Sequence, residues 1–160
     1  MSSTNNFVNC IPEDAFTKEK LTYDIKNGVI LHNAISWSAE NGHTELTKAL
    51  INLGAAVNEN RNYPLELASR NGHTEIVKML LEAGANTCDS KPDEGYCLRM
   101  AAYNGYTTIV KLLLDAGANP MADNYKALKL ALCKQHMDVV ELLLDSIYQK
   151  RTIVPCCVKE

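Results

Sequence analysis

Apolar residues along this chain come in adjacent pairs that recur four residues apart, with polar residues between the pairs. Three stretches share this pattern, and their apolar members are Ile76, Val77, Leu80 and Leu81, then Ile109, Val110, Leu113 and Leu114, then Val139, Val140, Leu143 and Leu144. Positions i, i+1, i+4 and i+5 lie on one side of an α-helix. Each stretch is therefore predicted to be a helix with one buried stripe.

Both ends of these helices are marked in the sequence. Many helices end in a left-handed residue, which glycine adopts without steric cost, and glycines follow at positions 54, 84 and 117. The helix dipole favours negative charge in the first turn. Acidic residues stand there at Glu45, Glu75 and Asp138.

A shorter helical pattern precedes each long one. It pairs an apolar residue with a small residue three positions later, as in Ile35 with Ser38, Leu65 with Ala68, Leu98 with Ala101, and Leu128 with Ala131. A small residue lets two helices approach closely. One unit is thus a short helix, a tight bend and a longer helix, and a unit of this size must stack on neighbours to bury its apolar face.

The same pattern of residues recurs at a nearly constant spacing along the chain. Asn41–Lys48 is echoed by Asn71–Lys78 and Asn104–Lys111, and a weaker copy follows at Lys134–Glu141. The copies start at positions 41, 71, 104 and 134, so the first and last intervals are equal and the middle one is slightly longer. Self-similarity at this spacing is typical of repeat architectures and predicts four units.

The spacing and the residue pattern of these units resemble the ankyrin repeat. Residues 59–88 carry the likeness best, with Tyr63-Pro64-Leu65-Glu66-Leu67-Ala68, Gly72-His73, Glu75-Ile76-Val77, Leu80-Leu81 and Gly84-Ala85. The resemblance implies an all-α solenoid of stacked helix-turn-helix units joined by short β-turn or finger loops.

The resemblance divides the chain into three parts. Residues 1–27 are an N-terminal segment and cap, 28–147 the repeat domain, and 148–160 a C-terminal extension and tail. The four units are expected at about residues 28–58, 59–88, 89–121 and 122–147. Since the third unit is longer, the finger at residues 89–95 should protrude beyond the others.

Two details set these repeats apart. The shorter units with Asn-Tyr before the first helix, at Asn62-Tyr63 and Asn124-Tyr125, look like repeats of large DNA viruses of amoebae. In the last unit Gln135 replaces the glycine of the bend and Ile147 replaces the terminating glycine. The final helix is therefore predicted to continue toward Arg151.

Composition narrows the classes of partner. A formal charge of −3 and an isoelectric point near 5.8 lack the basic excess that nucleic-acid binding demands. No apolar run approaches the roughly 20 residues of a membrane helix, and the first residues are polar. We expect no nucleic-acid or membrane partner, an intracellular protein of the cytoplasm or nucleus, and a monomer.

Cysteine and histidine are the residue types in this chain that could bind a metal or act in catalysis. The cysteines are Cys10, Cys88, Cys97, Cys133, Cys156 and Cys157. Without a secretory leader or a regular spacing they are interpreted as free thiols. Cys88 and Cys97 lack the Cys-x-x-Cys spacing usual in zinc sites, and no cofactor or metal is predicted.

The histidines recur with the repeat, at His43, His73 and His136. Layers of a solenoid do not converge on one point, so these rings cannot gather into a metal or catalytic site. The resemblance implies that they hydrogen-bond neighbouring loops. No phosphate loop, paired-carboxylate motif or Ser-His-Asp signature appears, and the chain is predicted not to be an enzyme.

The resemblance places partner binding on the concave face and fingers, at variable positions of the unit. These include Ser36; the residues predicted to contact a partner are Glu40, Arg61, Tyr63, Glu66, Arg70, Tyr96, Arg99, Tyr103, Tyr125, Lys126, Lys129 and Lys134. Tyr and Arg predominate at binding hot spots. Charge passes from acidic to basic along the set, so an acidic segment should favour the C-terminal half.

We therefore expect a protein–protein interaction module or adaptor. Two alternatives remain open. One is a stand-alone protein inhibitor, for example of a kinase, because four-repeat cyclin-dependent-kinase inhibitors have this size; only fold analogy supports it. The other, from a different class, is a thiol- or metal-dependent enzyme.

Overall fold

The computed structural model describes residues 31–87 and 95–152. In these two ranges the chain forms eight α-helices and no strand. The helices are α2 (Leu31–Asn41), α3 (Thr44–Asn52), α4 (Glu59–Asn71), α5 (Thr74–Glu82), α6 (Tyr96–Asn104), α7 (Thr107–Asp115), α8 (Ala122–Lys134) and α9 (Met137–Thr152).

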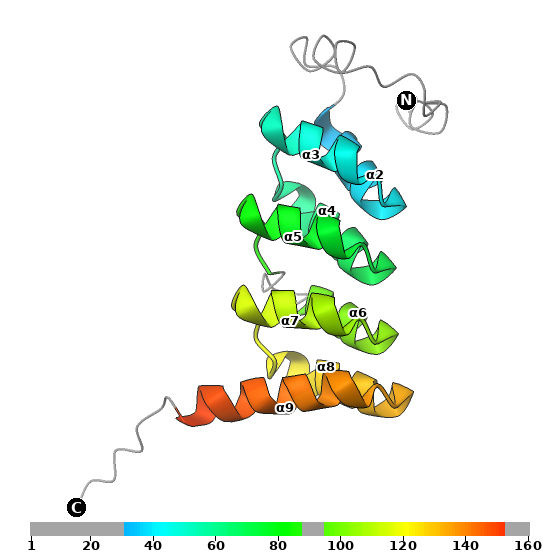
Figure 1. Ribbon diagram of the computed structural model, residues 1–160. Coiled ribbons are helices and arrows are strands. Elements are labelled where there is room, and N and C mark those ends of the chain that lie inside the picture. The colour runs from blue at the N-terminus through cyan, green and yellow to red at the C-terminus, as the bar shows by residue number, and fades with distance from the viewer. Residues whose placement is uncertain (1–30, 88–94, 153–160) are drawn as a thin grey trace, which may run out of the picture.

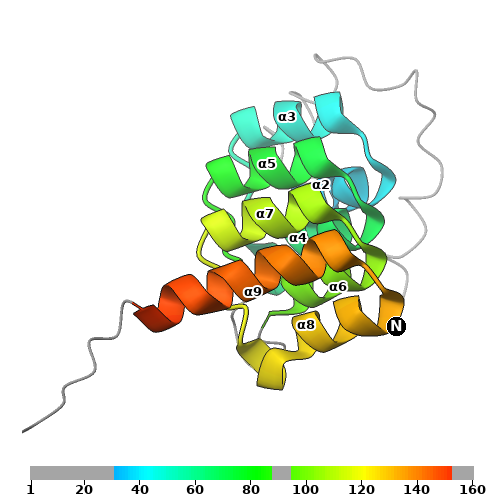
Figure 2. The same ribbon diagram turned by 60° about the horizontal axis from the view of Figure 1, so that its bottom comes forward.

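The helices are arranged as four layers of two (Figure 1). Each layer pairs a helix from the row α2, α4, α6, α8 with one from the row α3, α5, α7, α9, as the rotated view in Figure 2 shows. This confirms the predicted all-α solenoid of stacked helix pairs. The predicted N-terminal cap, the long finger and the tail fall largely or wholly outside the described residues, and the unit limits stay predictions.

The glycines end the long helices as predicted. Gly84 has a φ of 87°, in the left-handed region. Its amide donates to the carbonyl of Leu81, and the next amide, of Ala85, donates to the carbonyl of Leu80. This is the Schellman arrangement, which satisfies carbonyls that the helix leaves unpaired. The same hydrogen bonds recur after α3 and α7.

The predicted apolar stripes form the core. One leucine in the stripe of each long helix is fully buried, and the four are Leu50, Leu80, Leu113 and Leu143. Leu81 and Leu114 are half-buried and pack against this core. Leu144, at the same position of the last layer, is exposed. In the described part of the chain nothing stacks beyond α9, which explains the difference.

The last layer departs from the others in two ways. As predicted, α9 passes Ile147, which is buried, and continues to Thr152. The sequence did not predict a left-handed turn at the start of α8, where Asp123, Asn124 and Tyr125 have φ values of 46°, 54° and 59°. Three successive non-glycine residues in this region are rare, because the Cβ approaches the backbone.

The cysteine prediction needs a correction. Cys97, fully buried in α6, is disulfide-bonded, so the interpretation of all six cysteines as free thiols is wrong for this residue. Cys133, the other cysteine in the described ranges, is a free thiol and is exposed. Spacing along the chain did not reveal the pairing, because it depends on how residues meet in the folded protein.

Candidate protein-binding surface

The short helices α2, α4, α6 and α8 lie side by side and present equivalent positions, layer after layer (Figure 2). These positions follow one another at the period of the repeat and form three rows. The first row is Tyr63, Tyr96 and Lys126; the middle row is Ser36, Glu66, Arg99 and Lys129; the last-turn row is Glu40, Arg70, Tyr103 and Cys133. We call these rows, with Lys134, the short-helix surface.

The last-turn row is open to solvent along its length. Glu40, Tyr103 and Cys133 are exposed. Arg70 lies between two of them and places Nη2 3.3 Å from Oε1 of Glu40, with both side chains more than a third exposed. A pair this exposed contributes little to stability. Both side chains therefore remain accessible to a partner.

The middle row begins with a correction. Ser36 was predicted to line the partner-binding face, but it is buried, with only 4% of its surface exposed. Its short side chain ends below the level that the longer side chains of Glu66 and Arg99 reach. The contacting part of this row is therefore confined to α4, α6 and α8.

Arg99 is the most heavily engaged residue of the surface. Its guanidinium lies over the ring of Tyr96, 5.6 Å from the ring centroid. Its Nη1 donates to Oδ2 of Asp123 at 3.0 Å, which links α6 to the left-handed turn of α8. With a side chain only 19% exposed, Arg99 is fixed in place by these two partners.

The positive charge of the surface is concentrated on α8. Lys126, Lys129 and Lys134 are all exposed, and within the described residues none of them forms an ion pair. Lys134 reaches back to the preceding layer, where its Nζ lies 4.5 Å from the ring centroid of Tyr103, a cation–π contact. The charges of Arg70 and Arg99 are balanced by Glu40 and Asp123. The positive charges of this surface that no carboxylate pairs with in the described residues therefore lie on α8.

The remaining two predicted residues are less informative. Tyr125 lies in the left-handed turn with a φ of 59° and is half-buried. Arg61 belongs to α4, but its side chain lies outside the described residues. The structure therefore groups most of the predicted residues on one surface and leaves Arg61 undecided.

The backbone beneath the last-turn row is held by side chains from the following layer. The carbonyl oxygen of Glu40 accepts from Nδ2 of Asn71 at 2.8 Å and from Nε2 of His73 at 3.0 Å. The same contact is repeated from Asn104 to Arg70, at 2.9 Å, and from His136 to Tyr103, at 3.1 Å. Each layer therefore fixes the backbone on which the row of the layer before it is mounted.

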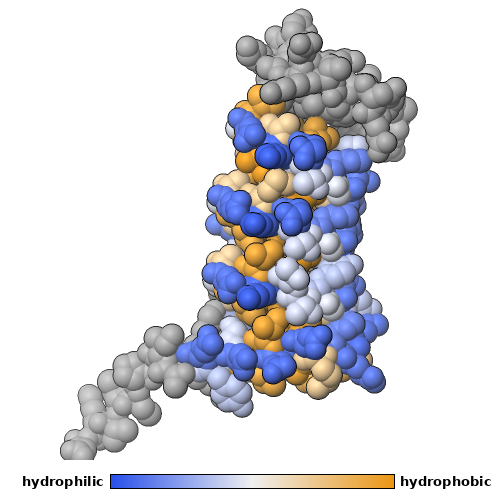
Figure 3. All heavy atoms as spheres, in the orientation of Figure 1, coloured by the Kyte–Doolittle hydropathy of each residue, from blue (hydrophilic) through white to orange (hydrophobic). Residues whose placement is uncertain are grey.

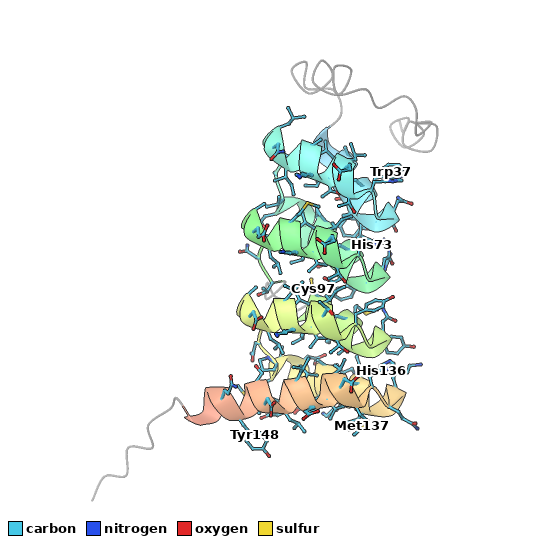
Figure 4. All side chains as sticks on the ribbon, in the orientation of Figure 1. Trp37, His73, Cys97, His136, Met137 and Tyr148 are labelled. Atoms are coloured by element: carbon cyan, nitrogen blue, oxygen red, sulfur yellow. The ribbon has the colours of Figure 1, made fainter. Side chains whose placement is uncertain are left out.

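Aromatic rings lie against glycine beside these hydrogen bonds. The His73, Tyr106 and His136 rings lie so close to the preceding bend that a Cβ added to Gly42, Gly72 or Gly105 would come within 2.7 Å of them. At the first layer Trp37 stacks on His43, with ring centroids 4.8 Å apart. Figure 4 shows Trp37, His73 and His136 along one edge of the column. This confirms the structural interpretation of His73 and His136.

The surface holds no arrangement suited to metal chemistry. Among residues 31–87 and 95–152, no group of three or more His, Cys, Asp or Glu side chains could hold a metal ion. In the same ranges no helix is long and apolar enough to cross a membrane. What the surface offers is Tyr, Arg and Lys side chains on a fixed backbone, which suits contact with another macromolecule.

Sequence reasoning missed Cys133, Asn71 and Asn104. Cys133 continues the last-turn row, and counting one repeat onward from Tyr103 identifies its position. The recurrence of asparagine before the bend, at Asn71 and Asn104, signals the carbonyl contacts in the same way.

Comparison with known proteins agrees with this geometry. A family model described as ankyrin repeats, in three copies, matches residues 12–91 and 86–153. The two matches together cover most of the chain. A search of curated proteins found no matching relative.

Proposed function

The chain belongs to the ankyrin-repeat family, and we propose that it acts as an adaptor that binds a partner protein through the short-helix surface. Ankyrin repeats are generally protein–protein interaction modules and typically not enzymes. The observation that carries the proposal is the fixed backbone under the last-turn row, because a surface ordered before binding loses less entropy when a partner docks.

Tyr103 and Arg99 are at the centre of the proposed contact. Both lie on α6, between the layers that carry Glu40 and the α8 lysines. Tyr103 is 38% exposed, and Arg99 is already ordered by Tyr96 and Asp123. Tyr and Arg are enriched among residues whose truncation costs most in an interface.

The lysines of α8 define the class of partner. Because they have no carboxylate partner in the described residues, we propose that an acidic segment of the partner lies over α8. Opposite charge raises association rates at low salt, and the gain falls as salt increases. We also propose that the protein acts inside the cell, as expected from the sequence.

The test is affinity capture of the partner followed by binding measurements with purified proteins. Arg99→Glu with Tyr103→Ala should abolish capture, while circular dichroism shows retained helix. The matched control is Lys111→Glu with Thr108→Ala, which makes the same charge change on exposed residues of α7. Equal capture by both double variants would place the contact elsewhere and refute the proposal.

The acidic-partner proposal has its own measurement. Lys129→Glu with Lys134→Glu should slow association on the order of tenfold at low salt and remove most of its salt dependence. Lys48→Glu with Lys78→Glu, on the exposed side of α3 and α5, is the matched control. An unchanged association rate in the α8 variant would rule out an acidic segment over α8.

A further inference from the structure

The last layer leaves a cluster of large apolar side chains in solvent. Of the seven exposed large hydrophobic residues in the described part of the chain, four belong to α8 and α9: Leu132 (50% exposed), Met137 (63%), Leu144 (36%) and Tyr148 (65%). Figure 4 places Met137 and Tyr148 along the edge of α9 that faces away from α7, and apolar surface reaches the same edge in Figure 3. We call these four residues the end face.

Leu132 shows that the end face does not accept another layer of the same kind. The equivalent residues in the earlier layers are Ala39, Ser69 and Ala102, all small and all fully buried. A small side chain is required there because the next layer packs against it. A leucine at this position projects into the volume that a following layer would fill.

Gln135 leads to the same conclusion at the bend. Gly42, Gly72 and Gly105 occupy this position in the earlier layers, and each lies beneath a ring of the following layer. A Cβ at Gly105 would come within 2.7 Å of the His136 ring. Gln135 adopts the same left-handed conformation, with φ 60°, but it does carry a Cβ. A ring stacked as in the earlier layers would collide with it.

Charges of opposite sign lie beside the end face on its two helices. Lys126 and Lys129 lie on α8, and Asp138, Glu141 and Asp145 follow one another along α9. All five side chains are exposed. A second copy that places its α9 over this α8 would bring these acidic residues near the two lysines.

Lys129 supplies the most specific argument. Its equivalent in the preceding layer, Arg99, crosses the layer boundary to the carboxylate of Asp123. Lys129 occupies the same position in the last layer, and within the described residues no carboxylate pairs with it. Glu141 lies between Met137 and Leu144 along α9 and is exposed, so we assign it as the carboxylate that a second copy supplies to Lys129.

We propose that the end face binds a second copy of this chain, with the two columns joined end to end around a two-fold axis parallel to α8 and α9. In this arrangement α8 of each copy packs on α9 of the other, and Lys129 pairs with Glu141 in two equivalent contacts. Because both use Lys129, the second copy and the acidic partner segment compete for α8. The end face offers only four large apolar side chains per copy, so the dimer should be weak compared with stable complexes, which bury roughly 800 Å² per partner. We propose this dimer in place of the monomer expected from the sequence.

The first test is sedimentation of the full chain from about 1 µM to about 1 mM, the range in which small interfaces assemble. The mass should rise from monomer toward dimer. Met137→Glu with Leu144→Glu should raise the dissociation constant at least about tenfold, since both charges enter the apolar contact. Leu53→Glu, at an exposed leucine beyond α3, should leave it unchanged. The proposal is overturned if the protein is a monomer at every concentration, or if the double variant dimerises with the same dissociation constant as the wild type.

A charge exchange identifies the occupant. Lys129→Glu and Glu141→Lys should each weaken the dimer, because each places like charges opposite one another. The variant carrying both changes should recover it, and so should a mixture of the two single variants, in which both contacts join opposite charges. If neither recovers it, the second copy does not sit on α8 and α9 as proposed.

Discussion

Replacing Gly72 by alanine should destabilise the protein far more than replacing Gly84. The two glycines have nearly the same backbone conformation, with φ values of 84° and 87°. They differ in what a side chain would meet. A Cβ at Gly72 would lie 2.7 Å from Cζ of Tyr106, whereas a Cβ at Gly84 has nothing within 4 Å. Comparing Gly72→Ala with Gly84→Ala therefore separates two costs: the clash with the following layer, and the strain of an L-residue in the left-handed conformation.

The magnitudes follow from these two terms. An L-residue in the left-handed region costs about 1–2 kcal/mol, and stiffening of the unfolded chain returns about 0.4–1 kcal/mol. Gly84→Ala should therefore lower the free energy of unfolding by about 1 kcal/mol. Gly72→Ala adds the displacement of the Tyr106 ring, an overpacking cost of about 1–3 kcal/mol. Its total should be about 2–4 kcal/mol.

The assay is urea unfolding followed by far-ultraviolet circular dichroism. Gly72→Ala should have the lower midpoint, and adding Tyr106→Ala should cost less in the Gly72→Ala protein than in the wild type, because the clash is then absent. Stacked repeats need not unfold in one step, so coincident transitions by tryptophan fluorescence serve as a check. Equal midpoints for the two alanine variants would refute the idea that ring contact requires glycine at this bend.

Two further predictions concern single side chains. Gln135→Gly should raise the free energy of unfolding by about 0.5–1 kcal/mol in urea melts at low protein concentration, since glycine adopts φ near 60° without strain; a lower midpoint would show that the Gln135 side chain is itself stabilising. Leu98→Ala should cost about 2–5 kcal/mol because the side chain is only 1% exposed, whereas the neighbouring Arg99→Ala should cost less than Leu98→Ala, because the carboxylate of Asp123 is half exposed and solvent screens the ion pair. Comparable thermal midpoints for the last two variants would contradict this ranking.

The fold could be predicted from the sequence because each layer repeats one local rule. Apolar pairs four residues apart determine which side of a helix is buried, as Leu80 and Leu113 show, and glycine after each long helix marks its end. These signals act within a few residues of one another. They can therefore be recognised without knowledge of the rest of the chain.

The surface was harder to predict, because contacts between layers depend on side-chain length and direction. The period assigned Ser36 to the same row as Arg99, but it could not tell that the short hydroxyl would be buried and the long guanidinium would reach Asp123. The left-handed turn of Asp123, Asn124 and Tyr125 was missed for a related reason. No glycine marks it, and its ion pair with Arg99 joins residues 24 positions apart.

The side-chain contacts between layers also bear on how the chain folds. The hydrogen bond from Asn104 to Arg70 joins residues 34 positions apart, which is about the separation between equivalent residues of neighbouring layers. Distant parts of such a chain need not find one another during folding, because a pair of neighbouring layers already contains every type of contact that the column uses. Folding can start at whichever pair forms first and spread in both directions. The folding rate should then be set by the formation of one such pair, while the number of layers determines how much stability accumulates afterwards.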